Sequence, residues 1–163
     1  MSTQDNLMIE LENYKEVRPS DLNMRKTVKN VELLITAYKQ EAIKAGVRAA
    51  PKVTASYSIV PPTYGNDFHS TTESAALDNI EKFEKMEYFV KKINQGLERI
   101  ECVLDPERRE RRKVIFVDKF IIGSNKTRIM EKLMIEHTTY HMELNMAVTD
   151  FACELGIEQR VTT

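Results

Sequence analysis

Apolar residues recur every three or four positions through most of this chain, which is the spacing that places side chains on one face of an α-helix. The pattern predicts helices over residues 5–15, 21–45, 74–104, 106–122 and 137–155, with one more short helix before the last. Glycine and proline number only five each among 163 residues, so they can interrupt few of these segments. We therefore predict an all-α fold.

The N-terminal part is predicted to be a helical scaffold interrupted by one long loop. Ser20 or Asp21 is the expected N-cap of the second helix, and Gly46 is its expected C-terminal end. Residues 47–74 then hold three of the five prolines and many Ser and Thr, a composition that supports neither a helix nor paired strands. Structureless loops of this length are uncommon in compact domains unless they are functional or linkers. We expect this loop to pack through its aromatic side chains, which are Tyr57, Tyr64 and Phe68.

The C-terminal third is predicted to form a helix-turn-helix unit. Asp105-Pro106 should end the long helix and begin the next, because proline fits the first turn of a helix. Gly123 should end that helix, and Ser124 or Asn125 should cap the short helix that follows. The apolar positions of the last two helices can interlock across a tight turn. These boundaries divide the chain into a scaffold of residues 1–105, which ends with a long connecting helix, and a helix-turn-helix domain of residues 106–163.

Charged residues are clustered locally in this chain, although its net charge is small. The net charge is -1, so the molecule as a whole has no strong field to attract nucleic acid or an acidic membrane. Residues 107–132, however, carry nine Lys or Arg and four Asp or Glu, whereas residues 133–163 carry one Arg and five acids. Attraction to DNA would therefore have to come from the first of these two segments.

Candidate sites for catalysis or metal binding are weak. His137 and His141 stand four residues apart on one helix, which is a metal-ligand spacing, but HTTYH lacks the acid of HExxH and His69 is the only other histidine. No GxxxxGK[ST], GxGxxG or GxSxG motif is present. We expect neither a cofactor nor an enzymatic activity, and a metal-dependent enzyme ranks far behind the other hypotheses.

Cellular location follows from what the sequence lacks. Cys102 and Cys153 lie far apart, outside any CxxC pair, and both are expected to be free thiols within helices. The first residues do not form a secretory signal, and no run approaches the ~20 apolar residues that span a bilayer. We therefore expect a cytoplasmic protein without a membrane partner.

The run TRIMEKLMIEHTTYHMELNMAVTDFACELG resembles the C-terminal unit of the ArpU-like phage transcriptional regulators. The segment APKVTASY, followed by a glycine, a Ser/Thr cluster and a long helix, resembles the middle segment of the same family, and the likeness covers roughly residues 25–156. It implies a non-enzymatic regulator of phage or prophage late genes with a C-terminal unit similar to region 4 of sigma factors. The residues of the last run that stand at matching places are Thr139, Tyr140, Asn145, Ala147, Phe151, Ala152 and Gly156.

On this hypothesis two different elements of the C-terminal unit contact DNA. Phosphate contacts supply affinity and base-edge contacts supply specificity, so the two sets of residues need not share a helix. The expected base contacts are His137, Thr138, Thr139, His141 and Asn145. The expected phosphate contacts are Arg108, Arg109, Arg111, Arg112, Lys113, Lys126 and Arg128. The partners would be late-promoter double-stranded DNA and host RNA polymerase.

Other interpretations of the same residues stay open. A run such as ERRERRK is most often a solvated helix face, and exposed Thr, Asn and His residues need have no ligand. Met142, Met146 and Cys153 form a second apolar stripe that is either a wide core face or a protein interface. The alternative function is a helical protein-protein adaptor in which the helix-turn-helix is only architectural. The sequence leaves the oligomeric state open, and a homodimer is one of the alternatives.

Overall fold

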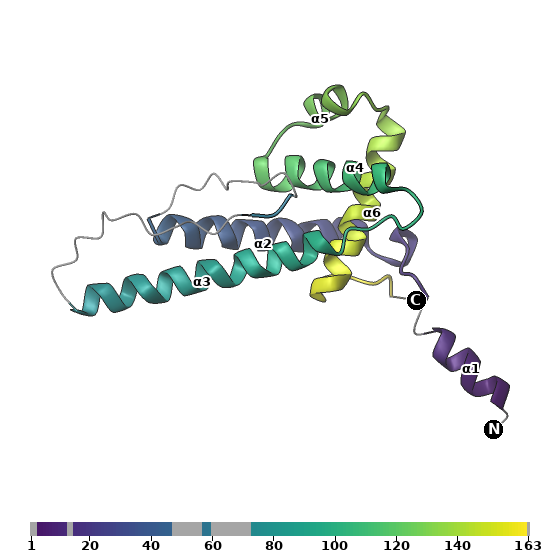
Figure 1. The fold of residues 1–163 in the computed structure, drawn as a ribbon, viewed down its shortest axis with the longest axis horizontal. Helices are drawn as coiled ribbons and strands as arrows, with labels where there is room; N and C mark the ends of the chain where they lie inside the picture. Colours follow the sequence, from purple (N-terminus) through teal and green to yellow (C-terminus); the bar gives the residue numbers. More distant parts are fainter. Residues whose placement is uncertain (1–2, 13–14, 47–56, 60–72, 163) are drawn as a thin grey trace.

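The computed structural model describes residues 3–12, 15–46, 57–59 and 73–162, and over these residues its regular structure is helical (Figure 1). The prediction of an all-α fold is confirmed. The element order is α1 (Thr3–Glu12), η1 (Pro19–Asp21), α2 (Met24–Lys44), α3 (Glu73–Glu98), α4 (Pro106–Phe116), η2 (Val117–Ile122), α5 (Lys126–Leu133) and α6 (His137–Leu155). None of the helices in this part of the chain is long and apolar enough to cross a bilayer.

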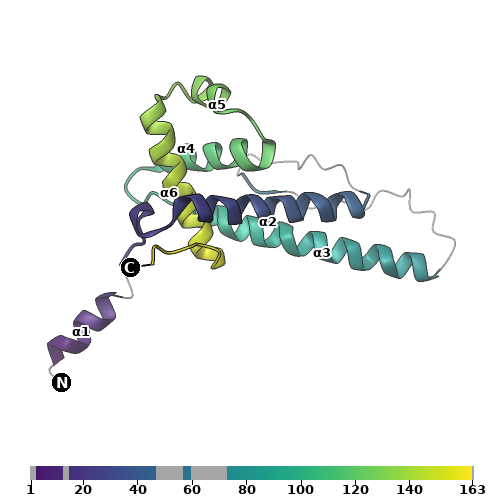
Figure 2. The same ribbon diagram turned by 180° about the vertical axis from the view of Figure 1, so that it is seen from behind.

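Helices α2 and α3 lie side by side as a long pair, with α4, α5 and α6 gathered at one end of it (Figures 1 and 2). Helix α1 projects from the opposite side of that end. The N-cap of α2 is Asn23, whose side chain accepts a hydrogen bond from Lys26 N at 3.1 Å, and neither Ser20 nor Asp21 has this role. The reason is local, since Asp21 belongs to the separate 3-10 turn η1 and accepts a hydrogen bond from Arg18 N. Helix α2 ends at Lys44 with Ala45 as its C-cap, one residue before the predicted position, and Gly46 follows with a left-handed backbone.

The long helix ends earlier than its apolar pattern predicts. Helix α3 stops at Glu98, not near residue 104, because the chain tightens there into i to i−3 bonds from Arg99 N to Gly96 O and from Ile100 N to Leu97 O. Ile100 is fully buried, whereas Leu104 is 96% exposed, so the two residues cannot share a helical core face. Asp105 then caps α4 by accepting from Arg108 N, and Pro106 begins that helix as predicted. Cys102 consequently lies in the turn and not in a helix, although both cysteines are free thiols.

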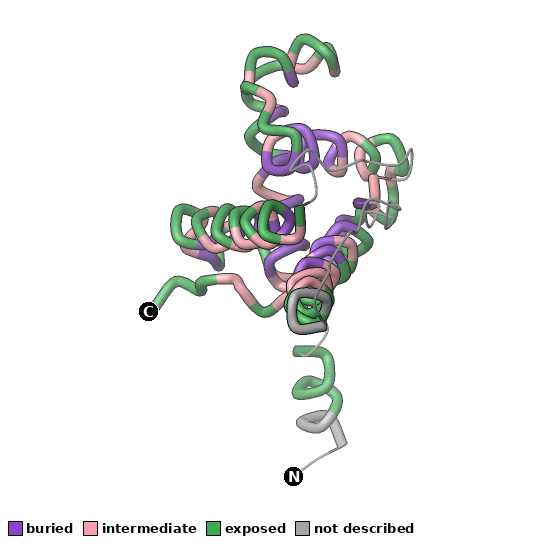
Figure 3. The backbone as a smooth tube through the Cα atoms, turned by 90° about the vertical axis from the view of Figure 1, so that its left-hand side faces the viewer, coloured by how far each residue is buried: buried purple, intermediate pink, exposed green. Residues whose placement is uncertain are grey.

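One hydrophobic core is shared by helices from the scaffold and from the C-terminal unit (Figure 3). Helices α3 and α6 cross at Gly96, where a Cβ atom would lie 2.5 Å from the Phe151 ring, so only glycine fits. The Phe151 ring also packs on Phe116 of α4, with ring centroids 4.4 Å apart. Helix α6 therefore runs through the centre of the molecule and ties α4 to the α2–α3 pair.

The chain after α6 is fastened to the start of α2. Asn30 Nδ2 donates to Ile157 O at 2.8 Å, and Asn23 N donates to Gln159 O at 2.7 Å. Thr27, which is completely buried, accepts from Gln159 N through its hydroxyl group. This tail fixes the C-terminal end of α6 against α2 and leaves its N-terminal end to project beyond the core (Figure 1).

Of the predicted loop, residues 57–59 and 73–74 lie within the described residues, and the last two already belong to α3. The predictions for Tyr64 and Phe68 lie outside the described residues. Ile59 is buried, and the side-chain amide of Asn94 on α3 both accepts from Ile59 N at 2.7 Å and donates to Ile59 O at 3.0 Å. Tyr57 is half-buried and packs against the core, as its prediction required.

Candidate nucleic-acid interface

Helices α5 and α6 are joined by a turn of three residues, Met134 to Glu136, which gives the predicted helix-turn-helix connection. Asn125 caps α5 by accepting from Arg128 N at 2.8 Å, and the preceding helix ends at a left-handed Gly123. Both features agree with the predicted boundaries. Met134 has a left-handed backbone with φ of 50°, although its side chain is 92% exposed and fills no space in the core.

The predicted base-contacting residues occupy the projecting N-terminal end of α6, but they are not equally accessible. His137, Thr138 and His141 are exposed, and the two imidazole rings lie 4.5 Å apart. Thr139 and Asn145 are half-buried. The structure thus brings together the residues of the first turn and a half, and places Asn145 closer to the scaffold.

A cation from α5 joins this end of α6. Lys126 Nζ lies 2.9 Å from His141 Nε2 and 5.7 Å from the centre of the Tyr140 ring. Partial desolvation lowers the pKa of His141, and the positive charges of Lys126, His137 and Lys119 lower it further, even though the ring remains exposed. Lys126 and His137 thus contact His141, and the charge of Lys119 also acts on it; we name Lys119, Lys126, His137 and His141 the α6 basic cluster.

The arginines of α4 are placed differently from what the sequence predicts. Arg112 is buried, and its Nε donates to Glu143 of α6 at 2.6 Å while another of its nitrogens donates to the backbone oxygen of Glu101 at 2.7 Å. The prediction that Arg112 contacts DNA phosphates is revised, because its guanidinium faces the interior. Arg108 shares the same carboxylate at 2.7 Å, and this contact raises the pKa of Arg108.

The remaining predicted phosphate contacts form two groups. On α4, Arg109 lies near the carboxylates of Glu101 and Glu110, and half-buried Arg111 lines a shallow groove with Val114 and Leu133. Half-buried Lys113 lies on the same helix. On α5, Arg128 is exposed and stands two residues from Lys126. Among the predicted phosphate contacts, Lys126 of α5 has a direct contact with a predicted base-contacting residue.

Sequence reasoning missed two residues of this region. Glu143 is completely buried and holds both Arg108 and Arg112, and the signal was its position beside Leu144 on the apolar face of the last helix. The charge of Lys119 in η2 also lowers the pKa of His141, an effect between distant segments that no spacing in the sequence indicates. Within the described ranges, no three His, Cys, Asp or Glu side chains are grouped as metal ligands would be, and His69 lies outside those ranges.

Two phage-related proteins are similar to this chain over most of its length. The protein Gp66 of Listeria phage A118 is 33% identical over 138 residues, which are 85% of this chain and 90% of that protein. An uncharacterized phage-related protein of Listeria innocua serovar 6a is 29% identical over 136 residues, which are 83% of this chain and 91% of that protein. No protein-family model matches the chain, and no solved structure matches it.

Proposed function

We propose that this chain, which belongs to the same family of phage proteins as Gp66 of Listeria phage A118, is a DNA-binding transcriptional regulator of phage or prophage genes. The resemblance of its C-terminal run to the ArpU-like regulators supports the finer proposal that it activates late genes through promoter DNA and host RNA polymerase. Neither DNA binding nor activation of late genes requires an enzymatic activity of this chain.

The observation that carries the proposal is the α6 basic cluster. Lys126 of α5 donates a hydrogen bond to His141 Nε2 of α6 at 2.9 Å, the His137 ring lies beside that of His141, and the charge of Lys119 in η2 also acts on His141. These neighbouring cations disfavour a positive charge on His141, so a phosphate bound beside them offsets that effect and favours the protonated imidazole. The N-terminal end of a helix adds backbone N–H groups and a partial positive charge, both of which favour phosphate.

We assign the contacts by exposure and by position. Exposed Arg128 and half-buried Lys126, which contacts His141, hold phosphates from α5. The exposed side chains of His137, Thr138 and His141 meet base edges in the major groove. The hydroxyl of Thr and the imidazole of His can hydrogen-bond to bases, and the methyl group of Thr can contact thymine. The half-buried Asn145 has a smaller role than the sequence pattern indicates.

Fluorescence anisotropy with labelled duplexes tests this function. Late-promoter DNA should bind more tightly than random DNA of the same length, and Lys126→Ala should weaken both complexes similarly. Thr138→Val, which keeps the shape of the side chain and removes its hydroxyl, should reduce the preference for promoter DNA. Equal affinity for promoter and random DNA, unchanged by Lys126→Ala, would contradict the proposal.

The adaptor function is the second candidate, and exposed apolar side chains favour it. Ile122, Met134 and Met142 are 57%, 92% and 49% exposed near the same end of the molecule, and flexible methionines suit adaptable protein interfaces. If the adaptor hypothesis holds, Met142→Glu should abolish capture of a host protein while DNA binding is absent in every variant. Salt-sensitive DNA binding by the unmodified chain would favour the regulator instead.

A further inference from the structure

The face of α3 that turns away from the core carries apolar side chains with nothing from the described part of the chain covering them. Leu77, Ile80 and Tyr88 are 62%, 47% and 56% exposed, whereas the core-facing Met86 and Val90 are buried. The spacing of three and four residues puts Leu77, Ile80, Glu84, Tyr88 and Lys91 on one side of the helix, and we name these five residues the outer α3 stripe.

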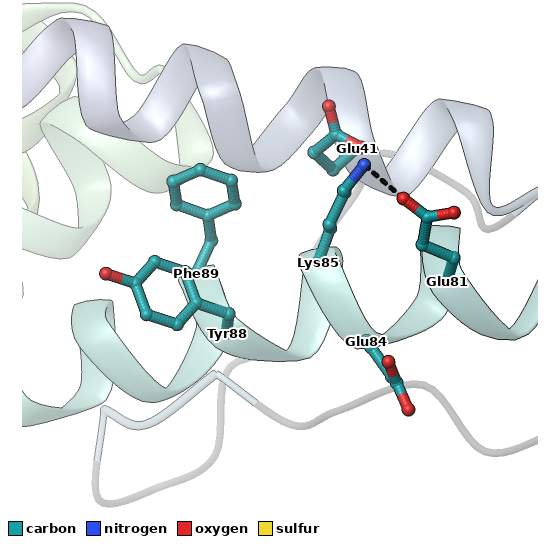
Figure 4. A pocket seen from close by; sticks show the side chains of 6 residues that line it. All are labelled: Glu41, Glu81, Glu84, Lys85, Tyr88 and Phe89. Atoms are coloured by element: carbon teal, nitrogen blue, oxygen red, sulfur yellow. Dashed lines mark hydrogen bonds and ion pairs between the residues drawn. The ribbon is translucent and has the colours of Figure 1, made fainter.

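A hollow of about 600 Å³ between α2 and α3 adjoins the outer α3 stripe (Figure 4). Its lining combines two aromatic rings, Tyr88 and Phe89, with charged side chains of both helices. Lys85 reaches Glu81 at 2.8 Å and points with it toward Glu41 of α2, while the ring of Tyr88 lies beside them with Lys92 Nζ 5.8 Å from its centre. The shape and the mixed lining suit a helix laid along α3.

The charges along α3 indicate which helix fits. Residues 73–84 carry four acids and one Lys, whereas residues 85–92 carry three Lys and one Glu. A second α3 laid parallel to the first would place acids against acids. An antiparallel α3 places the acidic half of each helix against the basic half of the other, so a single surface becomes self-complementary under a two-fold axis.

We propose that the outer α3 stripe is a homodimer interface, with α3 of a second copy packed antiparallel on it. Twenty-six residues of helix extend over about 39 Å, enough length for several turns of each helix to meet. Tyr88 of each copy enters the interface together with Leu77 and Ile80, which buries apolar area that is exposed in one copy alone.

This inference goes beyond the proposed function and does not depend on it. Dimeric helix-turn-helix proteins present two copies of the second helix to two half-sites. A two-fold axis at α3 would give the assembly two α6 basic clusters, yet the dimer would form without DNA. Dimer formation and DNA binding can therefore succeed or fail separately.

Light scattering during size exclusion, in the absence of DNA, tests the proposal. At about 100 µM, above the micromolar Kd of even a modest interface, the chain should have twice its 18.9 kDa monomer mass. The acidic variant Lys91→Glu/Lys92→Glu and the basic variant Glu81→Lys/Glu84→Lys should each be monomeric, because each makes the whole stripe repel itself. A mixture of the two should form a heterodimer of one chain of each.

The matched control is Lys26→Glu/Lys29→Glu, which makes the same change of charge on exposed positions of α2 and should remain dimeric. Circular dichroism confirms that each variant keeps its helical content. If a charge variant unfolds, Tyr88→Glu replaces it, since that side chain is exposed and its replacement should also give a monomer. A monomeric unmodified chain at this concentration, or folded charge variants that stay dimeric, or a mixture that yields no heterodimer, would overturn the proposal.

Discussion

Replacing Glu143 by Ala should destabilise the protein strongly, because this carboxylate neutralises a buried cation. The side chains of Glu143 and Arg112 are 1% and 7% exposed, and their charged atoms lie 2.6 Å apart. Arg108 makes a second contact at 2.7 Å, but its side chain is 37% exposed and can turn to water. Removing Glu143 leaves Arg112 charged and enclosed, with only the Glu101 backbone oxygen still accepting from it.

The size of this effect follows from the uncompensated charge. Breaking a buried ion pair by removing one partner costs about 3–5 kcal/mol, whereas replacing the whole pair with apolar residues is often neutral. Glu143→Ala should therefore lower the free energy of unfolding by about 3–5 kcal/mol, which corresponds to a fall in Tm of roughly 6–20 °C for a chain of this size. The double variant Arg112→Met/Glu143→Leu should recover most of that stability.

Urea denaturation followed by circular dichroism at 222 nm measures both values. The double variant is the control, because it keeps a similar side-chain volume and removes both charges. A destabilisation below about 1 kcal/mol for Glu143→Ala, within the range of exposed ion pairs, would refute the view that α4 is held to α6 by a buried charge pair.

Three further predictions concern the turn between α5 and α6, the half-buried Asp150 and the α6 basic cluster. Met134→Gly should stabilise the protein by about 0.5–1 kcal/mol, because glycine adopts the left-handed backbone without strain and the exposed methionine side chain has little packing to lose. A midpoint of urea denaturation that is unchanged or lower would contradict this prediction. Burial raises the pKa of Asp150 to about 6, so the stability that its carboxyl group contributes is present at low pH and lost as the pH rises through that value. Between pH 4 and pH 7, Asp150→Asn should therefore gain up to about 3 kcal/mol in free energy of unfolding over the unmodified chain. Urea melts in which the difference between the two proteins stays constant with pH would exclude this effect. DNA phosphates should raise the lowered pKa of His141, so binding takes up a proton and affinity in anisotropy titrations should increase as the pH falls. His141→Ala should reduce that increase, and an identical pH dependence in both proteins would argue against contact at His141.

Local signals in the sequence predicted most helix boundaries. Gly46, Gly123, Asn125 and Pro106 each mark a helix end that the structure contains, because their effects depend on the backbone nearby. The early end of α3 was not predicted, since Leu104 continues the apolar spacing while the chain needs residues 99–105 to turn back toward α6. Periodicity identifies apolar positions, but it does not distinguish a helix from a turn that buries one of them.

The candidate site was harder to predict because its contacts join distant parts of the chain. The basic run of α4 has the appearance of a solvated face, and only the packing of α4 on α6 reveals that Glu143 occupies two of its arginines. Because Arg108 and Arg112 of α4 pair with Glu143, they do not serve as the predicted phosphate contacts, and α5 supplies the cation that contacts His141. A charged residue on an apolar helix face, such as Glu143, is the signal that a buried partner should be sought.

The proposed DNA binding depends most on the phosphate contacts of α5, and the salt dependence of DNA binding measures these contacts directly. The slope of log Kd against log salt concentration changes by about 0.9 for each phosphate that the protein no longer neutralises. Lys126→Ala/Arg128→Ala should therefore reduce the slope by about 2, whereas Arg25→Ala/Lys26→Ala at the exposed start of α2 should leave it unchanged. A slope that is the same in the α5 variant and the unmodified chain, or DNA binding that does not depend on salt, would contradict the account.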